Sequence, residues 1–297
     1  MAVTLISQES PTRINQFINA SEPCTIEEFC REEEAEVLDF LGERPLHTVF
    51  IAGLIRDNGL VSPDNRGSFY ACRSRGGDLE GVGLVGHATV LETRTERALL
   101  AFAHVARNCQ AHVIRGEQQT IERFWDHYAH NGQAPRLVCR ELLFEQCEVP
   151  VIQDRIADLR PATIGDLDKV MAVNASMAFQ ESGISPLKTD PAGFRQRTAR
   201  RIEQGRIWVW IEDNRLVFKA DIVADTPQVI YLEGVHVHEE ERRKGYGLRC
   251  LTQLSSTLLE SAQSICLTIN ERNKKAICFY EKAGYQFHSN YETIYLP

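Results

Sequence analysis

The chain has 297 residues, of which 41 are acidic and 33 are basic, for a net charge of −8. This length predicts about two domains, each large enough to bury its own core. Residues 151–297 carry 19 basic and 19 acidic side chains, and this balance argues against nucleic-acid binding through a broad basic surface.

The first half of the sequence alternates between helical and strand-like segments. The apolar spacing predicts helices over 26–41, 46–56, 95–108 and 118–130. It predicts strands over 68–72 and 82–91 around a turn at 76–78, and further strands over 111–114 and 141–144. We place a domain junction near residues 149–151, which divides the chain into residues 1–150 and 151–297.

Three glycines of the first half, Gly81, Gly83 and Gly86, have the spacing of a dinucleotide-binding fingerprint. That motif requires a helix to begin directly after it. Residues 87–91 are strand-like instead. We therefore interpret these glycines as positions in a strand that admit a close neighbour.

The second half gives a similar pattern. Helices are predicted over 167–180, 194–204, 245–260 and 274–282, and strands over 207–211, 216–223, 229–238 and 264–270. A loop over 181–191 joins the first two helices. Both halves therefore belong to the mixed α/β class.

The junction between the strand 229–238 and the helix 245–260 is the most informative stretch of the chain. Arg242, Arg243 and Lys244 precede Gly245 and Gly247 there. The glycines allow a ligand to approach the backbone, and the free N–H groups and dipole of the helix N-terminus favour an anion. The stretch predicts a pyrophosphate site, in which a branched side chain at Gly247 would replace a phosphate oxygen.

The spacing Arg242-x-x-Gly245-x-Gly247 after a strand resembles the acyl-CoA-binding motif of the GNAT superfamily of N-acyltransferases. Downstream, Asn273-x-x-Ala276-x-x-x-Tyr280-x-Lys282 resembles the next motif of that superfamily. Residues 159–167 resemble its opening strand and helix start, so the resemblance covers residues 151–297. One departure is Glu239, where many members carry proline.

The resemblance implies a mixed, mostly antiparallel sheet flanked by helices, and acetyl transfer from acetyl-CoA to a primary amine by direct attack, without a metal. The implied acyl-CoA contacts are Val235, His236, Val237, Arg242, Arg243, Lys244, Gly245, Tyr246, Gly247, Leu248, Asn273, Ala276, Phe279, Tyr280 and Lys282. The order of elements in the first half is also GNAT-like. It resembles the domain that precedes the acetyltransferase domain in some two-domain bacterial members.

The first half lacks an Arg-x-x-Gly-x-Gly turn, because residues 92–97 contain no glycine. We therefore expect one acyl-CoA site per chain, in residues 151–297.

Glu233 is the candidate general base, two residues before Val235 on the strand. The alternative for Glu233 is a solvated strand glutamate. A bulge at Gly234 would break the alternation of the strand and open it at the reacting centre. Tyr280 is the candidate acid, and its alternative is a packed helix aromatic beside Phe279. Asn273 fits both a pantetheine contact and the N-cap of the helix that follows.

Two other residue types offer weaker signals. His236 and His238 alternate on the strand, but they lack a third ligand at a clear spacing, so we predict no metal site. We expect Cys278 to be a buried apolar residue rather than a nucleophile. The nine cysteines are an odd number without a Cys-x-x-Cys pair, which predicts reduced thiols.

We expect a cytoplasmic protein that binds neither membrane nor nucleic acid, because there is no signal-like N-terminus and no run of roughly 18 apolar residues. Glu181, Glu233 and the tryptophans Trp208 and Trp210 are expected near the acceptor. The negative charge of the two glutamates indicates a cationic amine as the acceptor, on a small molecule, a protein N-terminus or a lysine. The rival hypothesis is a non-catalytic acyl-CoA sensor or interaction protein. The sequence gives no oligomeric state.

Overall fold

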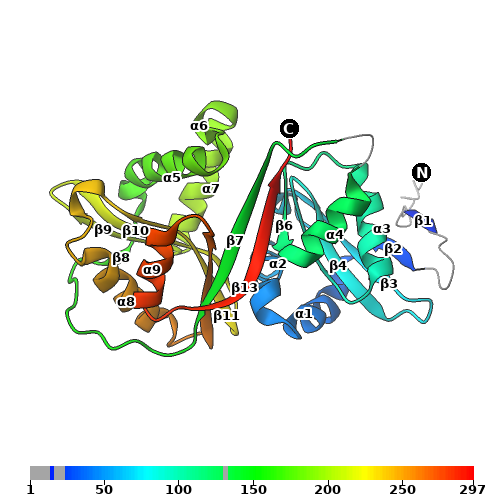
Figure 1. Ribbon diagram of the computed structural model, residues 1–297, viewed down its shortest axis with the longest axis horizontal. Helices are drawn as coiled ribbons and strands as arrows, with labels where there is room; N and C mark the ends of the chain where they lie inside the picture. Colours follow the sequence, from blue (N-terminus) through cyan, green and yellow to red (C-terminus); the bar gives the residue numbers. More distant parts are fainter. Residues whose placement is uncertain (1–13, 17–23, 130–132) are drawn as a thin grey trace, which may run out of the picture.

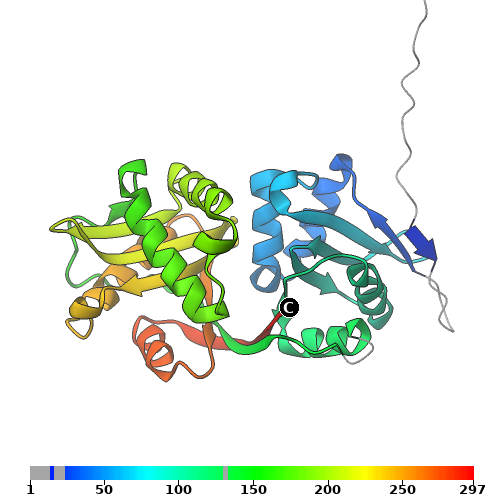
Figure 2. The same ribbon diagram turned by 90° about the horizontal axis from the view of Figure 1, so that it is seen from above.

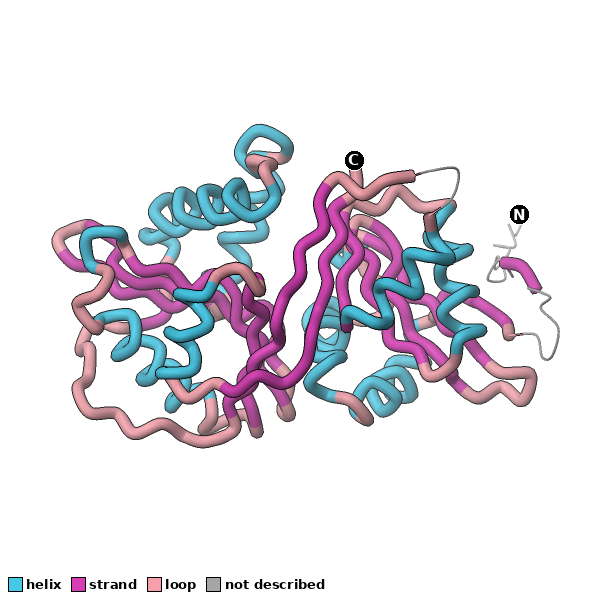
Figure 3. Tube along the Cα trace, viewed as in Figure 1, coloured by secondary structure: helices cyan, strands magenta, loops and turns pink. Residues whose placement is uncertain are grey.

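The computed structural model describes residues 14–16, 24–129 and 133–297 and has one continuous sheet with helices on both faces (Figures 1 and 3). The strand order is β1-β2-β3-β4-β5-β6-β13-β7-β12-β11-β10-β9-β8. All pairings are antiparallel except β5 with β6 and β11 with β12. The mixed, mostly antiparallel sheet predicted from the sequence is confirmed.

The strands are β1 (Ile14–Gln16), β2 (Thr25–Glu28), β3 (Gly67–Arg73), β4 (Leu79–Gly86), β5 (Ala88–Thr93), β6 (Val113–Glu117), β7 (Leu137–Gln146), β8 (Arg160–Pro161), β9 (Ile207–Glu212), β10 (Arg215–Asp225), β11 (Val229–Val237), β12 (Ser264–Asn270) and β13 (Gln286–Tyr295). The helices are α1 (Glu34–Gly42), α2 (Pro45–Asn58), α3 (Glu96–Arg107), α4 (Gln118–Tyr128), α5 (Leu167–Ser182), α6 (Pro186–Thr189), α7 (Pro191–Glu203), α8 (Tyr246–Leu258) and α9 (Lys274–Lys282). Short 3-10 turns cover Arg31–Glu33, Pro63–Asn65, Ile164–Asp166 and Glu239–Glu241.

The two halves of the chain exchange strands at the middle of the sheet. Strand β7 of the first half pairs with β12 of the second half, from Gln146 opposite Ile265 to Glu141 opposite Asn270. The last strand, β13, lies between β7 and β6 and pairs with both of them (Figure 1). The division into residues 1–150 and 151–297 remains a sequence prediction. The pairing shows that β7, from the first half of the chain, extends the sheet of the second half, and that β13, from the second half, extends the sheet of the first half.

A buried seam cluster joins α2 to the central strands. It contains Leu46 and Val49 of α2, together with Leu143, Ala224, Val229, Tyr231, Cys266 and Tyr291. Burying one such large apolar side chain contributes about 1.5–3 kcal/mol. Helix α2 of the first half is therefore held against β10 and β11 of the second half, as Figure 2 shows from above.

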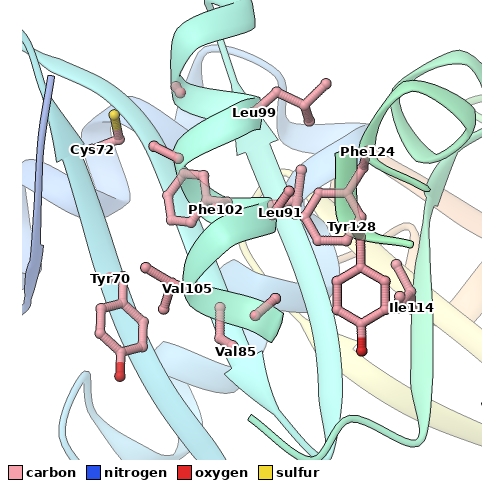
Figure 4. Packing of buried hydrophobic residues seen from close by; sticks show 14 of the residues in the cluster. Tyr70, Cys72, Val85, Leu91, Leu99, Phe102, Val105, Ile114, Phe124 and Tyr128 are labelled. Carbon is pink, nitrogen blue, oxygen red and sulfur yellow. The ribbon is translucent and has the colours of Figure 1, made fainter. Parts of the chain in front are cut away.

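The glycines Gly81 and Gly83 lie in β4 under a core aromatic side chain. A Cβ atom at either position would lie 2.8 Å from the ring of Phe102 on α3. Figure 4 shows Phe102 at the centre of this core. A Cβ at Gly86 would lie 2.4 Å from the Cα of Gly67, so the close-neighbour interpretation is confirmed for all three glycines. Strand β4 is followed by another strand rather than by the helix of a dinucleotide site.

Three sequence predictions about the elements need correction. Residues 26–41 are not one helix: Ile26 lies in strand β2 opposite Cys72 and is fully buried, because pairing with β3 overrides the helical spacing. The strand predicted over 82–91 is two strands, β4 and β5, which break after Gly86. The segment predicted as a loop over 181–191 contains the short helix α6, and α7 begins at Pro191. Beyond these three, strand β13 was not predicted at all, although it connects the two halves.

We predict that Gly53→Val on α2 loosens the contact between the halves. A Cβ at Gly53 would lie 2.5 Å from the Cβ of Ala224 and 3.0 Å from its backbone Cα, so α2 cannot keep its position. We expect a loss of about 1–3 kcal/mol in the free energy of unfolding, measured by urea denaturation. Gly42→Ala is the control, since no atom lies within 4 Å of its Cβ position. Equal stability of Gly53→Val and wild type would contradict this packing.

Candidate functional site

Strands β11 and β12 separate part of the way along their length. Their parallel pairing runs only from Val229 opposite Ser264 to Tyr231 opposite Cys266. Beyond this point β11 continues along β10, and β12 continues along β7. The separation leaves one side of residues 233–237 without a paired strand among the described residues, and an extended ligand can bind such an edge.

A β-bulge lies at this opening. Lys219 faces His236 and Asp221 faces Glu233, so Ala220 alone stands opposite Gly234 and Val235. Gly234 has φ +62°, a conformation that favours glycine. Glu233 lies beside Tyr231 on one face of β11. Because the bulge interrupts the alternation after Glu233, Val235 and Val237 pack on the other face, against the core beneath α8. The sequence left open whether a bulge forms at Gly234, and the structure contains one.

A buried lysine on the neighbouring strand β10 holds the bulge in place. The Lys219 side chain is fully buried, and its Nζ donates a hydrogen bond to the Gly234 carbonyl oxygen at 3.0 Å. The same Nζ lies 2.8 Å from Oδ1 of Asp221. Burial lowers the pKa of Lys219, while the Asp221 charge opposes that shift. Sequence analysis did not identify either residue.

The N-terminus of α8 is open to a ligand. Gly245 is its N-cap residue, with φ +84° and no side-chain hydrogen bond to the helix. No atom lies within 4 Å of the position that a Cβ at Gly245 would occupy. The backbone N–H groups of the first turn and the free space beside them suit an anion.

The basic residues before α8 are held by neighbouring groups. Arg242 donates through Nε to the Val237 carbonyl oxygen at 3.0 Å. Lys244 donates to Glu241 at 2.9 Å, and this hydrogen bond lowers the pKa of the Glu241 carboxyl. Arg215, which sequence analysis missed, also pairs with Glu241, at 2.7 Å. These contacts fix the turn with its positive charge near Gly245.

Gly247 has a packing role that differs from the one expected. A Cβ there would lie 2.8 Å from Cγ2 of Val237 and 3.4 Å from the ring of Phe279. A side chain at this position would therefore meet Val237 and Phe279, and the expectation that it would replace a phosphate oxygen stays a prediction. Gly247 allows β11, α8 and α9 to approach closely, which brings three expected ligand-contact residues together.

Helix α9 begins at an asparagine cap. The Asn273 side chain accepts a hydrogen bond from the Ala276 N–H at 3.1 Å. The Tyr280 ring packs edge-on against Phe279 and Tyr285, with centroid distances of 5.1 and 5.7 Å. Burial raises the pKa of the Tyr280 phenol, so the phenol remains protonated at neutral pH.

Other expected residues lie as follows. Leu248 and Tyr246 pack beside the α8 core, and Tyr246 meets buried Trp210 edge-on at 5.0 Å. Trp210 is therefore a core residue here. Cys278 is exposed, which corrects the expectation of a buried thiol, because it lies on the outer face of α9. Lys282 and Arg243 are exposed, and Arg243 has φ +66°.

Glu233 is held by a residue from the first half of the chain. Arg115 on β6 donates to Oε1 of Glu233 at 3.1 Å, and the Tyr231 hydroxyl donates to the same oxygen at 2.8 Å. Burial raises the pKa of Glu233, but the Arg115 charge and these hydrogen bonds outweigh it, so the pKa lies below its usual value. The side chain keeps 40% exposure. Glu233 is therefore an ionised carboxylate at neutral pH.

Two more glutamates lie close to this carboxylate. Glu181 at the end of α5 accepts a hydrogen bond from the Tyr295 hydroxyl at 2.9 Å. Surrounding protein and the nearby charge of Glu233 raise the pKa of Glu181, although part of its side chain stays exposed. Glu141 on β7 accepts from the Thr293 hydroxyl at 2.6 Å. The side of β11 opposite α8 is therefore acidic.

The histidines of β11 do not form part of a metal cluster. Burial lowers the pKa of His236 to about 4. Within the described residues, no three His, Cys, Asp or Glu side chains come together as metal ligands. Over the same part of the chain, no helix combines the length and the apolar character that crossing a membrane requires.

Comparison with known proteins gives matches in sequence family and in fold. Residues 220–294 match the family described as FR47-like protein. A search of curated protein sequences gave no match. A GNAT-family acetyltransferase from Colwellia psychrerythraea is similar in structure, with 11% identity over 92% of this chain and 100% of that chain and a TM-score of 0.55.

Two further solved structures have the same arrangement. A Drosophila protein has 11% identity over 92% of this chain and 98% of its own, with a TM-score of 0.68. A tandem GNAT protein from the clavulanic acid biosynthesis pathway has 13% identity over 91% of this chain and 98% of its own, with a TM-score of 0.57. The resemblance predicted from the two motifs is confirmed: the chain has the tandem GNAT fold, and its residues 220–294 match the FR47-like family.

Proposed function

We propose that the chain is an N-acetyltransferase that moves an acetyl group from acetyl-CoA to a primary amine by direct attack. The open N-terminus of α8 beside the separated strands β11 and β12 carries this proposal. Gly245 leaves space for a phosphate at the helix dipole, and residues 233–237 offer an edge for the pantetheine arm. The GNAT fold of the whole chain supports acyl transfer as the reaction class.

In this proposal, the acceptor amine binds on one face of β11 and the acyl donor binds on the other. On one face, the Glu233 carboxylate takes a proton from the ammonium group of the acceptor, because only the neutral amine can attack the thioester carbon. A backbone N–H of the strand near Val235 stabilises the developing oxyanion, an effect that typically contributes about 3 kcal/mol. When the tetrahedral intermediate collapses, the carbon–sulfur bond breaks, Tyr280 gives its proton to the sulfur, and the nitrogen loses its remaining excess proton to solvent, which leaves a neutral amide. Glu233 then releases its proton to solvent and Tyr280 takes one up, so both residues return to their starting states.

The acceptor in this proposal is a cationic amine. Glu141, Glu181 and Glu233 supply three carboxyl groups on the side of β11 opposite α8. Among the described residues, Arg115 is the cation that pairs with one of them, Glu233. Such a surface attracts a positively charged amine by long-range electrostatics. A small-molecule amine, a protein N-terminus and a lysine side chain all satisfy this requirement.

The alternative function is a sensor that binds acyl-CoA without catalysis. One feature supports it: the low pKa of Glu233 and its pairing with Arg115 make it a weaker proton acceptor than a free glutamate. Both functions predict binding, and only the acetyltransferase predicts turnover.

We expect free thiol to be released from acetyl-CoA when the protein is given a panel of amines. The panel includes polyamines, amino acids, aminoglycosides and a peptide with a free N-terminus, and mass spectrometry identifies the acetylated product. A protein that binds coenzyme A but acetylates none of these amines would favour the sensor.

Gly245→Ala should weaken coenzyme A binding at least tenfold, about 1.4 kcal/mol, because a methyl group would enter the open space at the α8 N-terminus. Gly205→Ala is the matched control: Gly205 also has a positive φ, +70°, and an open Cβ position. Both substitutions strain the backbone, and only the first lies at the proposed site. Calorimetry should give one site per chain for wild type. Equal affinities of the two variants would argue against this phosphate position.

Tyr280→Phe should leave coenzyme A affinity nearly unchanged and lower turnover by about 10²–10⁴, the usual span for loss of an acid–base catalyst. Its phenol carries a proton at neutral pH, since even the ordinary pKa of a tyrosine lies well above 7 and burial raises it further. Steady-state rates and calorimetry separate the two quantities. Turnover equal to wild type would return Tyr280 to a packing role beside Phe279 and Tyr285.

A further inference from the structure

Arg115 reaches the proposed catalytic strand from the other half of the chain. It lies on β6 opposite Thr293 of β13, and three strands separate β6 from β11 in the sheet. Its guanidinium nevertheless lies 2.6 Å from the Tyr231 hydroxyl and 3.1 Å from Glu233. The sheet must therefore curve so that β6 and β11 face each other across the seam.

The guanidinium is fixed in this place by more than its charge. It lies over the rings of Phe50 on α2 and Tyr231 on β11, each centroid 5.6 Å away. Only 20% of the Arg115 side chain is exposed. A planar guanidinium that is held by ring faces and hydrogen bonds presents its N–H groups in a fixed direction.

The hydrogen bonds around Glu233 are one-sided. Arg115 and Tyr231 both donate to Oε1, and among the described residues no donor contacts Oε2. The carboxylate is thus oriented through one oxygen while the other remains able to accept a proton. This asymmetry is what a positioned base requires.

Other charged groups around Glu233 do not replace Arg115. The titratable groups that act on this carboxyl or lie beside it are Arg115, Tyr231, Glu141, Glu181, Arg201, Lys219 and Asp221. Lys219 is already engaged with Asp221 and the Gly234 carbonyl, and the glutamates oppose ionisation of Glu233. Within the described residues, Arg115 is the cation in direct contact with Glu233.

We propose that Arg115 is a positioning residue, supplied by the first half of the chain, that holds the Glu233 carboxylate ionised and oriented toward the acceptor amine. This inference rests on the proposed acetyltransferase function. It makes the acceptor site a joint product of both halves, and it gives the first half a direct part in the reaction although that half lacks a cofactor turn.

The ratio of variant to wild-type kcat/KM, measured from pH 5 to 8, tests the proposal. Using the ratio cancels the titration of the substrate amine. In Arg115→Met, the guanidinium no longer offsets the surrounding protein and the charge of Glu181, so the pKa of Glu233 rises and the ratio should fall at least tenfold from pH 8 to pH 5. Arg115→Lys should restore a ratio that changes less than threefold.

Arg44→Met is the matched control. Arg44 is a second arginine at the seam, and it pairs with Glu92 and Glu117 rather than with Glu233. This variant should lose stability without a pH-dependent change in the rate ratio. A purely structural Arg115 would behave in the same way: if Arg115→Met lowered the rate by one factor at every pH, the proposal would be overturned.

A second measurement does not depend on turnover. In wild type, the lowered pKa of Glu233 means that its ion pair stabilises the fold above the unfolded pKa and is lost only as pH falls through the folded pKa. In Arg115→Met the pKa of Glu233 is raised, so the ionised carboxylate destabilises the fold at high pH. The loss in Tm should therefore be largest at pH 8 and shrink toward pH 5 as Glu233 is protonated.

The double variant Arg115→Met/Glu233→Gln should remove this pH dependence. If wild type acetylates no amine, the proposed function fails while the Tm series still tests the coupling of Arg115 to Glu233. A loss in Tm that is the same at every pH in the single and double variants would show that Arg115 does not control the charge of Glu233.

Discussion

The pairing of β13 with β6 on one side and β7 on the other is the interaction on which the rest of this structure depends. It closes the first half of the sheet with the last strand of the chain, while β7 closes the second half through β12. Separating the halves would expose strand edges and break the ladder hydrogen bonds at both places, which is costly for buried backbone groups. The seam cluster under α2 adds apolar burial to the same interface. Consequently the strands of the two halves keep a fixed arrangement where they join, and polar groups on β6, β7, β11 and β13 come into contact there.

The two halves contain similar elements, but the corresponding helices α3 and α8 differ in how their N-termini are capped. Helix α3 is capped by its own Thr95, whose hydroxyl accepts from the Ala98 N–H at 3.3 Å, whereas α8 begins at Gly245 without a side-chain cap. Just before α3, Glu92 is buried between Arg44 and Arg94. The helix start of the first half satisfies its own polar groups, and that of the second half leaves N–H groups for a ligand.

The bulge at Gly234 shows how a costly feature is retained at the proposed centre. A fully buried lysine is expensive to desolvate, yet Lys219 is compensated by Asp221 and by the Gly234 carbonyl. The same contact holds a glycine in a conformation with positive φ, and thereby turns Glu233 to one face of the sheet and Val235 to the other. Acceptor and acyl donor can thus approach the strand from opposite faces.

The sequence alone determined the second half well, because its signals are local. The turn at 242–247, the cap at Asn273 and the strand at 264–270 each depend on residues that are neighbours along the chain. Gly234 itself marked the bulge, although Lys219 of β10 holds it. The long-range features came only from tertiary structure. Ile26 entered a strand because β3 offered it a partner, and β13 has no strong pattern of its own until β6 and β7 pair with it. The contact of Arg115 with Glu233 spans 118 positions in the sequence. No local spacing encodes that contact, since it exists only when the strand exchange curves the sheet and brings β6 to face β11.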